Sequence, residues 1–249
     1  MTDVRIRNPR LRHAPDPAAL DALRGSRLQT VGRRAKYLLL DFGPDTLIVH
    51  LGMSGSLRIQ TRTPDLRPHD HVILSFGTTH LVYHDPRRFG GFVLTRSETL
   101  PAHPLLAHLG PEPLSTAFSG EHLYRLSRNR RQPVKNFIMD QRVVVGVGNI
   151  YATEALFRAG IRPDRAAGRI SAARYDRLAE VIRTVLHEAL AQGGTTLRDF
   201  VQSDGKPGYF AQTLQAYGRE GEPCITCGHV LRLVRLGGRA SVFCPACQR

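Results

Sequence analysis

The chain has 249 residues, a formal net charge of +14 and a hydrophobic fraction of 41%. This length supports a substantial hydrophobic core, divided between two domains or slightly more. There is no run of about 18 apolar residues, and the first residues lack a charged-then-apolar signal pattern, so we expect a cytoplasmic protein without a membrane span. The positive charge favours a polyanionic partner, above all a nucleic acid.

Residues 1–98 are predicted to form mainly β-structure. The opening stretch, MTDVRIRNPRLR, alternates apolar and basic residues in a way that is typical of a strand. A short helix is predicted at residues 17–23, and the strands predicted after it span residues 36–42, 46–51, 71–76 and 80–83. Short turns such as GPD and GTT indicate hairpins, and the spacing of the strands favours a sandwich or a barrel.

Residues 100–114 contain four prolines and are predicted to be a linker. Helices are predicted after it, at residues 119–128, 134–141, 149–159 and 171–192. The last of these has the clearest pattern, because an apolar stripe runs from Tyr175 to Ala189 and Gly193 follows its end. The predicted fold class is therefore α+β, with the β-sheet part first.

All four cysteines lie in the stretch CITCGHVLRLVRLGGRASVFCPAC, as two C-x2-C pairs separated by sixteen residues. Four thiolates at this spacing suit one tetrahedral zinc ion, whereas disulfides are the less favoured alternative in a cytoplasmic chain. The residues between the pairs alternate around Gly237 and Gly238, which predicts a hairpin with Arg239 near its tip. A closed site of this kind is structural, and it would hold the hairpin arginines rigidly.

Lysine is rare among the 35 basic residues and occurs only as Lys36, Lys135 and Lys206. A lysine can lose its proton when it is buried, which an arginine does not do. Each lysine is therefore a candidate functional position, although chance explains any single one equally well.

Three glycine-rich turns carry further candidate residues. HLGMSG and DPRRFGG place Met53 and Phe89 at turns that should face water. The simpler interpretation is that both are core residues and that the strands around them extend further than predicted. Next to DNA, they would instead act as wedges in the base stack, with Arg87 bonding the unpaired base. The glycines of GVGNIYATEALF precede a predicted helix whose first N–H groups can hold a phosphate, although a plain turn between helices is equally consistent with them.

The motifs RRAKYLL, HLGMSGSLR, HDHV, DPRRFG, HLGPEPL, MDQRVVVGVGNIYATEALF, GGTTLRDFVQSDGKPGYF and YGREGEPC, followed by the four-cysteine finger, resemble the formamidopyrimidine-DNA glycosylase family. They occur in order over nearly the whole chain. QSDGKPGYF is more similar to the formamidopyrimidine/8-oxoguanine branch than to the endonuclease VIII branch.

The resemblance implies a monomeric base-excision repair enzyme that binds damaged double-stranded DNA, flips out an oxidised purine and nicks the strand by β,δ-elimination. It implies a β-sandwich domain over residues 1–110, a helix–two-turn–helix domain over 111–216 and a zinc finger over 217–249. One structural zinc ion would be held by Cys224, Cys227, Cys244 and Cys247.

The family's functional residues carry over to matching positions of this sequence. Met53, Arg87 and Phe89 match the residues that fill the gap and contact the widowed base. Lys36 matches the lysine beside the lesion phosphate that assists β-elimination, and Arg239 matches the arginine of δ-elimination. The further implied DNA contacts are His69, Arg131, the phosphate-binding Asn149, and Lys206 in the loop over the flipped base.

The N-terminus departs from the family pattern, which opens with Pro-Glu-Leu-Pro-Glu after removal of methionine. There the proline amine is the nucleophile and the glutamate is the acid. The favoured expectation is an enzyme whose gene encodes these residues upstream of Met1, because losing the opening helix would uncover apolar surface. The alternatives are a catalytically silent DNA or lesion binder, a weak lyase that uses Lys36, and a zinc-ribbon RNA-binding protein.

Overall fold

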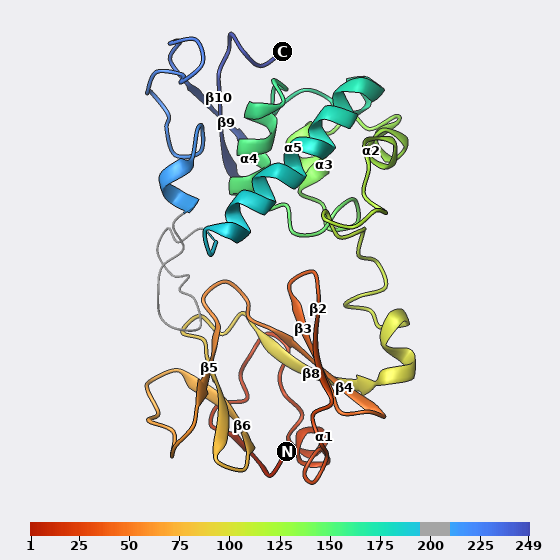
Figure 1. Ribbon diagram of the computed structural model, residues 1–249, viewed down its shortest axis with the longest axis vertical. Coiled ribbons are helices and arrows are strands. Elements are labelled where there is room, and N and C mark those ends of the chain that lie inside the picture. Colours follow the sequence, from red (N-terminus) through yellow and green to blue (C-terminus); the bar gives the residue numbers. More distant parts are fainter. Residues whose placement is uncertain (195–209) are drawn as a thin grey trace. The chain divides into compact units, whose positions relative to one another are not determined.

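The computed structural model of the chain describes residues 1–194 and 210–249 (Figure 1). These residues fall into two compact units, one of residues 1–107 and one of residues 108–194 and 210–249. Each unit has its own hydrophobic core. Within the two described ranges, no helix combines the length and the apolar character needed to cross a bilayer.

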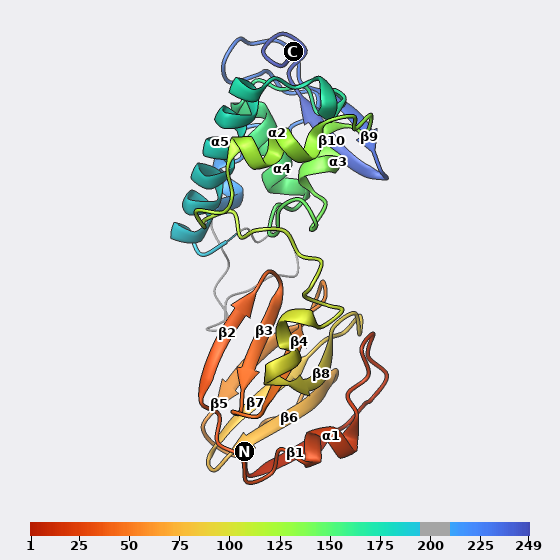
Figure 2. The ribbon, with the colours of Figure 1, turned by 90° about the vertical axis from the view of Figure 1, so that its right-hand side faces the viewer.

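The first unit is a sandwich of two antiparallel four-stranded sheets (Figure 2). One sheet has the order β1 (Asp3–Ile6), β6 (Asp70–Phe76), β7 (Thr79–His84) and β5 (Ser56–Gln60). The other has the order β2 (Thr30–Arg34), β3 (Tyr37–Asp41), β4 (Asp45–His50) and β8 (Gly91–Arg96). The predicted opening strand and both predicted hairpins are confirmed, whereas β2, β5 and β8 were not predicted.

Apolar residues from the inner faces of both sheets form the core of the sandwich. Leu47 and Val49 of β4 and Val72 of β6 are completely buried there. Helix α1 (Pro17–Asp21) begins where the Asp16 side chain accepts hydrogen bonds from the backbone N–H groups of the first turn. Its Leu20 packs into the same core, so α1 closes one edge of the hydrophobic cluster.

The second unit is helical and ends in a small β-hairpin (Figure 1). Its main elements are α2 (Gly120–Ser127), α3 (Val134–Ile138), α4 (Asn149–Arg158), α5 (Ala172–Ala191), β9 (Arg232–Leu236) and β10 (Arg239–Phe243). Two short 3-10 turns, Ala167–Arg169 and Phe210–Thr213, accompany them. The predicted stripe on α5 is confirmed, because Tyr175, Leu178 and Ile182 are all buried.

Some predicted boundaries differ from the structure, and helix α1 ends at Asp21, short of the predicted residue 23. Helix α3 ends at Ile138, short of the predicted residue 141, because the Asp140 carboxylate accepts a hydrogen bond from the backbone N–H of Arg142 and turns the chain. A 3-10 turn, Ser97–Ala102, occupies the start of the predicted linker. None of these differences changes which elements carry the candidate residues.

Candidate nucleic-acid interface and zinc site

Two loops of the sandwich project large apolar side chains into solvent. Met53 is 68% exposed and Phe89 is 40% exposed, so the expectation that they belong to the core is wrong. The Arg87 guanidinium lies 4.8 Å from the centre of the Phe89 ring, within the range of a cation–π contact. Apolar groups exposed in this way beside a cation contribute little to folding and are suited to binding.

The same two loops pack backbone against backbone. Gly52 has a φ of +72°, and a Cβ there would lie 2.7 Å from the Gly90 nitrogen. A Cβ at Gly90 would lie 1.8 Å from the Tyr83 hydroxyl oxygen. Glycine at both positions therefore allows an approach that any side chain would prevent, and it brings the backbone next to Met53 against the backbone next to Phe89.

Lys36 is exposed and lies in the two-residue turn between β2 and β3. Several positive charges gather near this turn. Burial lowers the pKa of His50, and the nearby charges of His13, Lys36 and Arg12 lower it further. A cluster of cations at one end of the sandwich is a suitable environment for a phosphate.

Unusual backbone conformations occur next to several candidate residues. Among the described residues, the non-glycine residues with left-handed φ values are Ala35, His69, Arg88 and Asn129. His69 is itself a predicted DNA contact, and Arg88 lies between Arg87 and Phe89. Strained residues of this kind persist where the surrounding structure holds them, and they are concentrated at functional sites.

Helix α4 begins at Asn149, where the helix predicted at residues 149–159 also begins, although Gly148 is the N-cap residue. The N-cap residue, Gly148, provides no side-chain hydrogen bond. The side-chain Oδ1 atom of Asn149 is buried and has no hydrogen-bond partner among the described residues. The first N–H groups of the helix suit an anion, whereas the Oδ1 atom, as an acceptor, offers an anion nothing. Arg131, also a predicted contact, is exposed in the segment before α3.

Lys135 is buried in α3 and connects that helix to the terminal hairpin. Its ammonium group donates hydrogen bonds to the backbone oxygen of Ala240 and to the hydroxyl of Ser241, both at 2.8 Å. Burial lowers the pKa of Lys135 to about 8, and the nearby charge of Arg239 contributes in the same direction. The rarity of lysine singled out Lys135 as a candidate functional residue, and the contacts that the structure shows for it hold the fold together.

The lowered pKa of Lys135 predicts a pH-dependent stability. Between pH about 8 and its ordinary pKa of 10.5, the folded state binds fewer protons than the unfolded state, so this residue increases stability as pH rises through that window. Lys135→Met should remove a rise of ~1–3 kcal/mol. Urea unfolding of both proteins at pH 7.5 and pH 10 tests this, and equal pH slopes would contradict it.

Arg239 lies at the tip of the hairpin, as predicted. It begins β10, directly after the Gly237–Gly238 turn, and pairs with Leu236 of β9. Its side chain is exposed, so the finger presents a cation on a short, well-defined turn.

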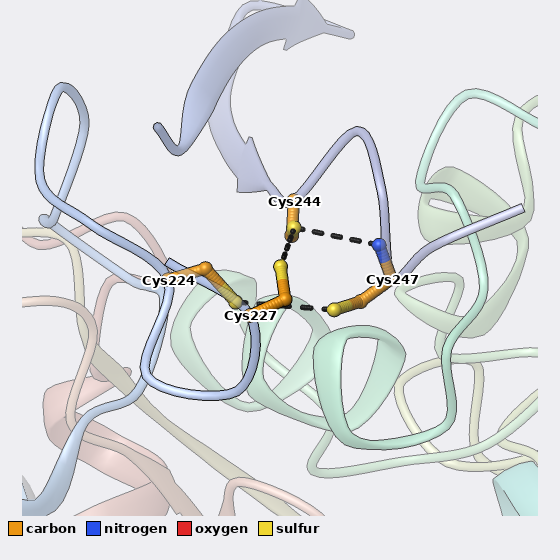
Figure 3. A group of neighbouring side chains, drawn as sticks. All are labelled: Cys224, Cys227, Cys244 and Cys247. Atoms are coloured by element: carbon orange, nitrogen blue, oxygen red, sulfur yellow. Dashed lines mark hydrogen bonds between the residues drawn. The ribbon is translucent and has the colours of Figure 1, made fainter. Parts of the chain in front are cut away.

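The four cysteines form one compact cluster (Figure 3). All four are free thiols, and their sulfur atoms lie within 4.8 Å of one another. A tetrahedral ion with Zn–S bonds of about 2.3 Å requires sulfur atoms about 3.8 Å apart, and the Cys224–Cys247 and Cys227–Cys244 distances are 4.0 Å and 3.5 Å. The cluster therefore fits one structural zinc ion.

Local hydrogen bonds favour the thiolate form at Cys224, whereas burial raises the pKa of Cys244, and a hydrogen bond with the Cys227 thiol raises the pKa of Cys247. Burial by itself would raise the pKa of Cys224, but the backbone N–H groups of Thr226 and Cys227 outweigh burial and lower it to about 7. The finger is also tied to the helices, because the Gln248 side chain accepts from Cys244 N and donates to the Ile161 oxygen, both at 2.8 Å.

Glu154, which the sequence patterns did not single out, anchors the segment that leads into the finger. This α4 carboxylate is fully buried and accepts hydrogen bonds from the backbone nitrogens of Gln215, Ala216 and Tyr217 at 2.8–2.9 Å. A charged residue among the apolar positions of NIYATEALF was the available signal.

Asp85, within the DPRRFG motif, is a second buried residue that the sequence patterns did not single out. Lys206 lies outside the described residues.

A β-sandwich, a helical unit with a four-cysteine finger and a large positive charge define a zinc-containing DNA-binding protein. Three family models match the chain: the formamidopyrimidine-DNA glycosylase N-terminal domain over residues 1–92, the formamidopyrimidine-DNA glycosylase H2TH domain over 109–201, and the zinc finger found in FPG and IleRS over 221–249. The chain belongs to the formamidopyrimidine-DNA glycosylase family.

Individual relatives agree with this assignment. A formamidopyrimidine-DNA glycosylase of Hahella chejuensis is 59% identical over 248 residues, which cover 99% of this chain and 91% of the relative. One of Methylococcus capsulatus is 60% identical over 251 residues, covering 100% of this chain and 92% of the relative.

Solved structures share the fold. The MutM (Fpg) protein of Thermus thermophilus has a TM-score of 0.86 and 41% identity, covering 99% of this chain and 90% of that chain. A Lactococcus lactis Fpg in complex with DNA containing an abasic site has a TM-score of 0.88 and 31% identity, covering 99% of this chain and 91% of that chain.

Proposed function

We propose that this protein is a base-excision repair DNA glycosylase and AP lyase that acts on oxidised purines, namely formamidopyrimidines and 8-oxoguanine, in double-stranded DNA. The observation that carries the proposal is the pair of exposed apolar tips beside Arg87 in a chain of net charge +14. An enzyme that extrudes a base must support the gap that the base leaves. A related Lactococcus lactis Fpg, 30% identical, is described in complex with Fapy-dG containing DNA.

In this proposal, Met53 and Phe89 fill the gap, and Arg87 hydrogen-bonds the widowed base. Lys36 and Arg239 hold phosphates next to the lesion and assist the β- and δ-elimination steps. The exposure of these side chains at turns supports their roles, because a phosphate or base edge must reach them without rearrangement of the core. The catalytically silent binder is not favoured, since relatives aligned with nearly the whole chain are named as glycosylases.

The remaining contacts secure the DNA backbone. We assign Asn149 to a phosphate at the start of α4, His69 and Arg131 to further backbone contacts, and Lys206 to the flipped base. We further propose a cytoplasmic, nucleoid-associated monomer with a sandwich domain over residues 1–110, a helix–two-turn–helix domain over 111–216 and a zinc finger over 217–249.

Base release and borohydride trapping test the proposal. A duplex with one 8-oxoguanine is incubated with a protein of residues 1–249. A parallel reaction uses the same protein extended at its N-terminus by the family's opening segment, which begins Pro-Glu. The extended protein should release the base, nick the strand and be trapped as a covalent adduct, because a secondary amine forms an iminium at C1′. The protein of residues 1–249, which lacks this secondary amine by design, serves as the comparison.

Matched variants of the extended protein separate the roles. Lys36→Ala should slow β-elimination and Arg239→Ala δ-elimination, whereas Arg125→Ala, at an exposed position of α2, should change neither. If the protein of residues 1–249 is trapped and Lys36→Ala abolishes the trapping, the nucleophilic amine is that of Lys36. Intact DNA after incubation with the extended protein would contradict the proposed activity.

Binding to duplex DNA should depend steeply on salt. With about four or five phosphate contacts, the slope of log K against log salt should be roughly −4, so affinity should fall ~10²–10³-fold between 50 and 200 mM salt. Fluorescence anisotropy with an undamaged labelled duplex measures this slope. A value near zero would exclude the proposed phosphate contacts.

A further inference from the structure

The Asp85 carboxylate lies between the two loops that carry the gap-filling candidates. It is fully buried. One carboxylate oxygen, Oδ1, accepts a hydrogen bond from the Ser54 hydroxyl at 2.8 Å. The other, Oδ2, accepts from the Tyr83 hydroxyl and from the backbone N–H of Gly90, both at 2.9 Å. One side chain thus accepts hydrogen bonds from both loops and from Tyr83 of β7.

The backbone of Asp85 extends the same network. Its N–H donates to the backbone oxygen of His69 at 3.0 Å, and its own oxygen accepts from the backbone N–H of Arg88 at 3.2 Å. The same oxygen also contacts the Nε2 atom of His71 at 2.9 Å. His69, directly before β6, and His71 within it are therefore joined to the loop that carries Arg87 and Phe89.

The hydroxyl of Ser54 relays the carboxylate to a second point on the loop. It donates to Asp85 and accepts a hydrogen bond from the backbone N–H of Arg87 at 3.3 Å. Ser54 directly follows Met53, and Gly90 directly follows Phe89. Each of the three gap-filling candidates is therefore fixed at its own backbone, or at the residue next to it, by a bond to Asp85 or to its Ser54 partner.

The loops need these hydrogen bonds because their exposed side chains supply little packing of their own. Met53 and Phe89 are the exposed ends of their loops. Arg88, between Arg87 and Phe89, has a left-handed φ of +59°. Loops held only by exposed side chains would sample many conformations, and the ordering cost would fall on DNA binding.

The carboxylate is charged at neutral pH. Burial would raise the pKa of Asp85, but the hydrogen bonds from Gly90, Ser54 and Tyr83 outweigh burial and lower it. An ionised acceptor makes shorter and stronger hydrogen bonds than a neutral one, and this favours a rigid arrangement before DNA arrives.

We propose that Asp85 is a positioning residue that sets Met53, Arg87 and Phe89 in the geometry needed to enter the base stack before DNA binds. The inference rests on the proposed function. Asp85 touches neither the reacting atoms nor the phosphates in this scheme, and it acts through Ser54 and Gly90. Its loss should therefore slow gap filling while the phosphate-driven affinity is kept.

Asp85→Asn tests this with a nearly isosteric change. The amide offers one acceptor oxygen and an NH2 group, so it cannot accept from Ser54 and Gly90 on both sides. The probe is a duplex with a tetrahydrofuran abasic-site analogue opposite 2-aminopurine. The stopped-flow rate of the 2-aminopurine fluorescence change should fall ~10-fold or more, with the equilibrium affinity for undamaged DNA within about twofold. Hydrogen exchange of residues 51–55 and 85–90 should increase in the free protein.

Two further variants keep the test sharp. Ser54→Ala removes only the relay and should give a smaller change of the same pattern, even if Asp85→Asn folds poorly. Asp65→Asn, at an exposed position, removes the same charge without any link to the loops and should match wild type. Unchanged rates and exchange in both Asp85→Asn and Ser54→Ala would overturn the inference. Failure of the wild type to bind the abasic duplex would instead overturn the proposed function.

Discussion

Removing zinc is expected to unfold the finger and to lower DNA affinity by about tenfold or more. The finger has a small core, formed by the two buried cysteines Cys224 and Cys244 with Leu231, Val242 and a few neighbours. Structural zinc in peptide fingers contributes apparent binding energies of about 10–16 kcal/mol, far more than such a core supplies. Without the metal, Arg239 at the hairpin tip loses its rigid support.

The measurement is direct. Elemental analysis of the purified protein should find one zinc per chain, and a chelator should remove it with a rise in hydrogen exchange across residues 224–247. Readdition of zinc should restore both protection and affinity. Cys224→Ser should resemble the chelated protein, whereas Ser171→Ala, far from the cysteines in sequence, serves as the control. Full DNA affinity in metal-free protein would contradict the structural role.

Glu154→Ala is expected to cost ~3–5 kcal/mol of folding stability. The substitution leaves the backbone N–H groups of Gln215, Ala216 and Tyr217 without their acceptor. Ala216 is completely buried, so water does not readily replace the carboxylate there. The three bonds fail together because a single side chain makes them all.

Urea unfolding of the zinc-loaded protein measures this loss. Glu154→Gln keeps an acceptor oxygen and should lose less stability than Glu154→Ala. Glu180→Ala changes an exposed glutamate of α5 and should stay within about 0.5 kcal/mol of wild type. A Glu154→Ala protein as stable as the Glu180→Ala control would show that the anchor is dispensable.

Regular patterns predicted most of the second unit and five of the eight strands of the first. Helix α5 was predicted well because burial on one face leaves a 3.6-residue period that is visible in a single sequence. Strand β2, TVGRR, is almost entirely exposed, so it carries no alternating pattern, and only its pairing with β3 makes it a strand. A strand that lies on the solvent side of a sheet edge is defined by its neighbour more than by its own residues.

The candidate site divides in a similar way. The cysteine spacing was sufficient to predict zinc, because ligand type and separation define a tetrahedral thiolate site locally. Exposure of Met53 and Phe89 was not predictable, since an apolar residue in a glycine-rich turn is equally consistent with a core position. Their exposure becomes evident only in the tertiary structure, where the two loops meet with Gly52 against Gly90 and both side chains reach solvent.

The sequence by itself determined the charge, the zinc ligands, the helical part and the family resemblance, because each of these depends on composition or on residues close together in the chain. Tertiary structure alone decided the roles of Lys135, Glu154 and Asp85. Each is a buried charged group whose partners are distant in sequence or belong to another loop, such as Lys135 with Ser241 and Asp85 with Ser54. A buried charge is stable only when its partners are in place, and folding alone brings these partners together.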